Sequence, residues 1–244
     1  NRWLVAAAGD WRIAPGSRLE AEFESSRQSQ PSVPGFSLLG NRVPPPSDPS
    51  INLNNQPWSE PVVFGANTGS IRYTQAIDAN WRFSARLMGQ RLRTDDRTAF
   101  PFGCSAEGNY DRFCSDGSFD MYDYRSDDER RDSSAAELAV NGSVATGGVQ
   151  HTLGFGVLAT RFKSRFQRNA YNYVGSGNID GSVMLPADPT LNYENTNRDE
   201  RSTELFVHGA MQIGEKLRLW LGLRYTNLDR EAVSTDGTLG TDYS

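Results

Sequence analysis

The sequence predicts an all-β fold, in which residues 1–244 form part of an antiparallel transmembrane β-barrel. Three observations lead to this prediction. Apolar and polar residues alternate along most of the chain, which is the pattern of strands with two different faces. No stretch carries a sustained helical stripe of apolar residues. The connections between these segments are alternately short and long along the chain.

The alternation is clearest near the end of the chain. Every odd position from Leu217 to Leu223 is leucine, while the even positions include Arg218 and Arg224. The same period of two runs through residues 18–26, 81–89, 136–144 and 204–213. From Phe119 to Val144 the chain reads as one long strand whose first half is charged. We expect that charged half to extend the barrel wall above the membrane.

The connections fall into two groups. Tight turns are predicted at 14–17, 78–80, 145–148 and 214–216, whereas roughly 29–66, 96–117, 168–196 and 232 onward are long irregular segments. About eight strands therefore have short turns at one end and long loops at the other. Outer-membrane barrels have this asymmetry, with short periplasmic turns, long extracellular loops and strands that are apolar outside and polar inside.

A barrel in lipid would explain the row of leucines, because its outer face contacts lipid. We expect Leu217–Leu223 to face lipid and the arginines to face a wet interior, and a buried protein core is the alternative. Aromatic residues near strand ends suit the interfacial girdles of such a barrel. The candidates are Trp3, Trp11, Trp81 and Tyr225.

Composition excludes several other classes of protein. The net charge of −5 gives no argument for nucleic acid, and no run approaches the roughly 18 apolar residues of a membrane-spanning helix. The two histidines are far apart, and no catalytic, phosphate-binding or metal-ligating arrangement stands out. We therefore expect no enzyme activity and no bound cofactor or metal. The chain also looks like a piece excised from a longer protein.

Cys104 and Cys114 are the only cysteines, and they lie close together in a polar segment. Zinc would require two further ligands at suitable spacing, and none is nearby. A local disulfide is the preferred interpretation, and two free buried thiols remain the alternative. A disulfide would constrain the unfolded chain by roughly 3 kcal/mol and would indicate an oxidising compartment.

Several stretches resemble TonB-dependent outer-membrane receptors. The run GAMQIGEKLRLWLGLRYTNLDRE, residues 209–231, is similar to a hairpin of that family whose returning strand often ends in LGLRY. Residues 147–166 resemble the strand before it, and FPFGCSAEGNYDRFC, residues 100–114, resembles a cysteine-bridged loop. The ordered set is most similar to the ferric-siderophore branch, especially receptors for ferrichrome-like hydroxamates.

The resemblance implies a barrel of about 22 strands that is closed from within by a plug domain. The chain would then be a partial barrel domain, without the plug, the TonB box or the remaining strands. It implies a receptor in the outer membrane of a Gram-negative bacterium that imports a ferric siderophore. The implied partners are the TonB–ExbB–ExbD complex, outer-membrane lipid and lipopolysaccharide, and the implied state is a monomer.

The resemblance also suggests ligand contacts. In hydroxamate receptors, aromatic side chains on the extracellular loops and upper wall contact the siderophore, because aromatic walls bury its partly apolar surface. The matching positions here are Phe36, Leu38, Phe100, Phe102, Tyr171 and Tyr173. Leu38 departs from the aromatic pattern. These residues could instead pack one loop against another.

Other functions stay open. A TonB-dependent receptor could carry cobalamin, haem or a glycan, and a passive porin or a soluble β-rich binding module would belong to other classes. Arg130 and Arg131 could contact lipopolysaccharide phosphates, although a mixed-sign extension of the wall is the preferred interpretation.

Overall fold

The computed structural model describes residues 1–46, 48–238 and 240 of the chain. Strands dominate it, with one short 3-10 helix. The elements are β1 (Arg2–Ala14), β2 (Ser17–Gln30), β3 (Glu60–Ala76), β4 (Trp81–Pro101), η1 (Ser105–Glu107), β5 (Ser118–Thr146), β6 (Val149–Arg165), β7 (Ala170–Asn178), β8 (Thr196–Ile213) and β9 (Leu217–Ser234). The helical residues that the structure describes form no segment long and apolar enough to span a membrane.

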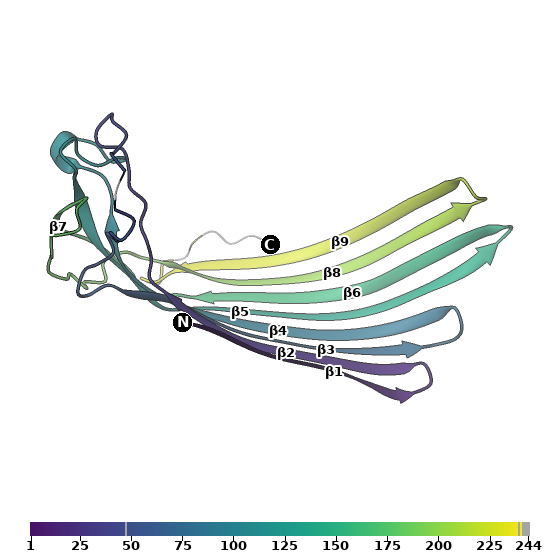
Figure 1. The fold of residues 1–244 in the computed structure, drawn as a ribbon. Helices are drawn as coiled ribbons and strands as arrows, with labels where there is room; N and C mark the ends of the chain where they lie inside the picture. Colours follow the sequence, from purple (N-terminus) through teal and green to yellow (C-terminus); the bar gives the residue numbers. More distant parts are fainter. Residues whose placement is uncertain (47, 239, 241–244) are drawn as a thin grey trace.

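The long strands form one curved antiparallel sheet (Figure 1). Neighbours follow the order β1-β2-β3-β4-β5-β6-β8-β9, so each hairpin lies beside the next. All four short turns lie at one end of the sheet and the long loops at the other (Figure 1). The predicted antiparallel barrel segment, with its alternation of short and long connections, is confirmed.

The predicted segment boundaries need two corrections at the loop end. β4 continues to Pro101 and β3 begins at Glu60, so strands enter segments that we expected to be irregular. A ninth strand, β7, also forms inside the predicted 168–196 loop. It pairs with Ser118–Arg125 of β5, which extends beyond the end of β6. β7 therefore covers an edge that would otherwise leave backbone groups without partners.

The register places charged residues together on one face of the sheet. Glu20 lies opposite Arg72, Arg72 opposite Arg86, and Arg86 opposite Glu137, and directly paired residues share a face. A hydrogen bond of 2.7 Å joins Arg72 Nε to a Glu20 carboxylate oxygen. This polar face is the lumen face of the barrel wall.

Below the loop end, the opposite face is apolar, and none of the residues that the structure describes packs over its leucine row. Leu221 is 62% exposed and Leu223 is 72% exposed, although both lie in the middle of a regular strand. Exposure of a whole leucine row argues against a soluble core and for contact with lipid. Of the predicted girdle residues, Trp3, Trp11 and Tyr225 are exposed on this face. Trp81 is half-buried and lies near Phe155, with ring centroids 5.9 Å apart.

The only hydrophobic core among the described residues lies at the loop end. It consists of Leu39, Leu53, Ala99, Phe113, Phe119 and Met121. The predicted disulfide between Cys104 and Cys114 is present beside it, with a Cα–Cα distance of 5.1 Å. Both cysteines are buried, and the Phe113 and Phe119 rings pack 4.8 Å apart. The core therefore fixes the long loops to one another and to the upper wall.

Candidate ligand-binding site

The upper wall, formed by β4, β5 and β7, carries a row of aromatic side chains. Phe100 lies opposite Tyr122, Tyr122 lies opposite Tyr173, and Tyr124 lies opposite Tyr171. Since directly paired residues share a face, these five rings lie on the same side of the wall. β4 alternates without interruption, so Phe100 is on the lumen face together with the even-numbered residues below it.

The rings contact one another as a continuous cluster. Tyr122 and Tyr171 stack almost parallel, with centroids 4.6 Å apart and planes 3° apart. The ring centroid of Phe100 lies 5.6 Å from that of Phe102 and 6.0 Å from that of Tyr171. These centroid separations are typical of favourable aromatic pairs. We call the whole set the aromatic cluster: Phe100, Phe102, Tyr122, Tyr124, Tyr171, Tyr173 and Tyr193.

The cluster offers both apolar surface and hydroxyl groups. Phe102 is 44% exposed and Tyr173 is 53% exposed, so both rings remain accessible to a ligand although they pack against neighbouring rings. Burial, followed by the neighbouring Tyr122 and Tyr193, raises the pKa of Tyr171 to about 12. The phenol of Tyr171 therefore stays protonated and can donate a hydrogen bond at any physiological pH.

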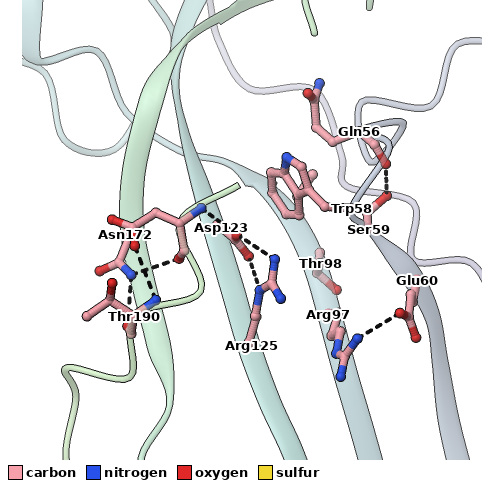
Figure 2. A network of polar contacts seen from close by, with 12 residues as sticks. Gln56, Trp58, Ser59, Glu60, Arg97, Thr98, Asp123, Arg125, Asn172 and Thr190 are labelled. Carbon is pink, nitrogen blue, oxygen red and sulfur yellow. Dashed lines mark hydrogen bonds and ion pairs between the residues drawn. The ribbon is translucent and has the colours of Figure 1, made fainter. Parts of the chain in front are cut away.

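The opposite side of the same wall is covered by loops. Residue 123 on β5 is a fully buried aspartate that accepts two hydrogen bonds from Arg125, at 2.8 and 2.9 Å (Figure 2). The backbone N–H of Asp188 donates a third hydrogen bond to Asp123, at 2.9 Å. Asn172 of β7 donates to the carbonyl oxygens of Asp188 and Thr190. The loop after β7 is thereby tied to the wall.

The first long loop joins the same network. The Arg125 guanidinium lies over the Trp58 ring, 6.0 Å from its centroid, and Figure 2 shows both side chains beside Asp123. Trp58 donates to the carbonyl of Leu185, and Gln56 bonds the backbone of Val183 and Leu185. Strand alternation therefore gives β5 one face that holds the loops and one that presents rings.

The sequence-predicted contacts separate into two groups. The structure brings Phe100, Phe102, Tyr171 and Tyr173 together in the aromatic cluster. Phe36 instead packs against the hydrophobic core of the loops. Leu38 is half-exposed, and its carbonyl accepts a hydrogen bond from the Phe113 N–H. The hairpin top that carries Phe36 and Leu38 thus serves loop packing here.

Sequence reasoning missed three members of the cluster. Tyr122 and Tyr124 alternate within the long predicted strand, and pairing that strand with the preceding one would have placed them beside Phe100. Tyr193 gave no local signal, because its position depends on the path of the loop after β7.

The described residues offer no metal centre. Within 1–46, 48–238 and 240, no group of three or more His, Cys, Asp or Glu side chains is arranged to hold a metal ion. The aromatic cluster itself offers apolar rings and phenol hydroxyls, with a few charged groups at its margin.

Comparison with known proteins agrees with this architecture. The family model "TonB dependent receptor-like, beta-barrel" matches residues 10–244. Comparison with curated protein sequences finds no significant match.

Solved receptor structures resemble the chain closely in fold. The open form of the ferric-catecholate import receptor Fiu from Escherichia coli K12 superposes with a TM-score of 0.77 at 18% identity, covering 96% of this chain and 38% of Fiu. The siderophore receptor PiuA from Acinetobacter baumannii gives 0.71 at 13% identity, with 99% and 37% coverage. The Pseudomonas aeruginosa FpvA–pyoverdine complex gives 0.68 at 18% identity, with 96% and 31% coverage.

The chain thus covers 31–38% of the length of these receptors. At such identities the structural likeness concerns the fold, whereas the family match extends over nearly the whole sequence. The lipid-facing row, the lumen face and the family match place this protein in the outer membrane of a Gram-negative bacterium. The chain belongs to the TonB-dependent receptor β-barrel family.

Proposed function

We propose that this chain is a part of the barrel domain of a receptor that imports a ferric siderophore by TonB-dependent active transport. The observation that carries the proposal is the aromatic cluster on the lumen face at the loop end of the sheet. A ligand arriving from outside the cell would meet this surface first. The plug, the TonB box and the remaining strands belong to the rest of the receptor.

A ferric hydroxamate fits the cluster better than a highly charged complex. Its charge is largely neutralised and its exterior is partly apolar, so aromatic surfaces can bury it. A tris-catecholate complex carries several negative charges and would need cations. The arginines near the cluster are already paired: Arg131 with Glu129 at 3.0 Å and Arg168 with Glu194 at 2.6 Å.

The remaining partners follow from the same proposal. The TonB–ExbB–ExbD complex would supply energy through the N-terminal part of the full receptor, and the receptor would act as a monomer. Cobalamin, haem or a glycan would be alternative cargoes for the same family. The family match sets aside the passive porin and the soluble module.

The outer face above the apolar band also suggests a membrane contact. Asp132 is shared by Arg91 and Arg130, and Asp199 by Arg161, Lys163 and Arg201. Within these ion-paired groups, five basic side chains share two carboxylates, which leaves positive charge for a further anion. We propose that this row contacts lipopolysaccharide phosphates. Arg131 is not part of it, because it pairs with Glu129 on the lumen face and lies over Phe166.

The test is a titration of the full-length receptor, purified in detergent, with a ferric trihydroxamate. Intrinsic tryptophan fluorescence reports binding. We expect saturable quenching in the wild type and at least about tenfold weaker binding in Phe100→Ala/Tyr173→Ala, since each ring contributes on the order of 1 kcal/mol or more. Both side chains are partly exposed, so the variant should fold.

Tyr225→Ala is the matched control, because Tyr225 is an exposed ring on the lipid-facing side. Binding should be unchanged in it. Equal binding by the wild type and the double variant would refute the placement of the site. Quenching by haem, cobalamin or a ferric catecholate, with no response to hydroxamates, would refute the proposed cargo.

A further inference from the structure

A pocket opens at one edge of the aromatic cluster and shares three of its rings. It has a volume of about 430 Å³. Its lining combines three aromatic rings with polar and loop residues: Ser32, Val33, Pro34, Asp96, Thr98, Phe100, Tyr124 and Tyr171. The segment 32–34 begins two residues after the end of β2, so the pocket lies between the upper wall and the start of the first long loop.

The pocket contains a carboxylate without a cation. Asp96 is half-buried, and Thr98 donates a hydrogen bond of 2.5 Å to it. Among the residues that the structure describes, no arginine or lysine forms an ion pair with Asp96. By contrast, the nearby carboxylates of Glu129 and Asp127 are paired with Arg131 and Arg97.

The electrostatic surroundings of Asp96 are negative. Burial raises the pKa of its carboxyl, and the charges of Glu129 and Asp127 raise it further, against the hydrogen bond from Thr98. A negative charge held under these conditions is stabilised by any cation that can reach it. Aromatic rings around a carboxylate add a second attraction, because the faces of aromatic rings attract ammonium groups.

We propose that this pocket binds an ammonium group carried by the transported ligand, with Asp96 as the counter-ion and Phe100, Tyr124 and Tyr171 as the enclosing rings. The inference deepens the proposed function and rests on it for the identity of the ligand. The substrate class becomes a ferric hydroxamate that bears a protonated primary amine. The iron centre would lie on the aromatic cluster, and its appendage would enter the pocket.

The first experiment compares two ligands on the full-length receptor in detergent. One is a linear ferric trihydroxamate with a free primary amine, and the other is the same complex with the amine acetylated. We expect the amine form to bind about tenfold more tightly, from one ion pair in a partly buried aromatic site. In Asp96→Asn, which keeps an acceptor for Thr98, the two ligands should bind equally.

Asp229→Asn is the control, since Asp229 is an exposed carboxylate on β9, far from the pocket in the sheet order. It should preserve the tenfold preference. Equal binding of the two ligands by the wild type would overturn the inference while leaving hydroxamate import intact.

A second measurement decides the matter if neither ferric complex binds, an outcome that would count against the proposed function alone. Fluorine NMR would follow para-fluorobenzylammonium and its neutral counterpart, para-fluorobenzyl alcohol, with the same receptor. Line broadening of the ammonium probe in the wild type, lost in Asp96→Asn, would support the pocket. Equal broadening of both probes, or of the ammonium probe in both proteins, would overturn it.

Discussion

Tyr171 shows how one side chain links burial to chemistry at the site. It stacks on Tyr122 and also lies close to Phe100, Tyr124 and Tyr193, so its ring is surrounded by other members of the cluster. Burial is the first cause of its raised pKa, because an ionised phenolate would lose solvation there. Tyr171 lies on β7, above the membrane-spanning part of the wall.

This gives a prediction about pH. The difference in tyrosinate absorbance between the full-length receptor and Tyr171→Phe should rise with a midpoint near pH 12, not near the ordinary value of 10.0. Because the folded pKa is raised, this group favours the folded site below pH 10 and loses that effect as the pH rises toward 12. A midpoint at the ordinary value would mean that the ring is open to water.

Asp123 supports the site from the other side of the wall. It is fully buried and holds both Arg125 and the backbone of Asp188. Asp123→Ala would leave the Arg125 charge without its partner, at a cost of about 3 kcal/mol or more. We expect faster hydrogen exchange in the loops at 31–59 and 179–195, with little change in β8 and β9.

Asp111→Ala provides the comparison, because the Asp111–Arg112 ion pair is exposed and should contribute under about 1 kcal/mol. If both variants exchange alike, the buried network does not hold the loops. If only Asp123→Ala loosens them and siderophore binding also weakens, the covered face positions the aromatic one.

At the scale of the strands, glycines allow large rings to cross between neighbours. A Cβ on Gly156 would come within 2.5 Å of the Leu138 carbonyl oxygen and 2.6 Å of the Phe206 ring. A backbone oxygen in the middle of a sheet cannot move aside. Gly156→Ala should therefore destabilise the barrel by about 1–3 kcal/mol, measured as a lower midpoint of heat unfolding on a gel.

Gly89→Ala serves as its control. The atom nearest to a Cβ at Gly89 is a backbone oxygen 4.0 Å away, so the added methyl meets no obstacle. This variant should be neutral or slightly more stable, because alanine restricts the unfolded chain. Similar destabilisation in the two variants would show that flexibility, not space, is what the strands require from glycine.

The sequence predicted what depends on local pattern. The alternation along residues 216–231 identified the lipid-facing row, and the clustered Cys104 and Cys114 identified the disulfide, because both signals lie within one segment. Strand β7 was missed because it pairs with the part of β5 that extends past the end of β6, and no local pattern marks that pairing. Tyr193 was missed because its position depends on the path of the loop after β7. For Phe36 the sequence left ligand contact and loop packing open, because its packing partners come from segments far along the chain.

In the molecule as a whole, the membrane-spanning part of the sheet and its loop end are stabilised by different interactions. Along most of its length, stability comes from backbone pairing and from the lipid around an exposed apolar face. At the loop end, a small core, one disulfide and a buried ion pair replace the lipid. The loop end can therefore hold a fixed arrangement of side chains above the membrane, as the proposed ligand site requires.

The open sheet gives the last prediction. β1 and β9 end the sheet order, and no pairing joins them within the described part of the chain. Their free N–H and C=O groups have no partner in lipid, where each unsatisfied group costs several kcal/mol. Residues 1–244 expressed alone should therefore form no closed pore: no heat-sensitive compact band on a gel, and no steady conductance in planar bilayers. The full-length receptor, refolded in the same detergent, should show the compact band. A monodisperse, heat-sensitive species from the isolated chain would mean that its own edges, or those of several copies, can close the sheet.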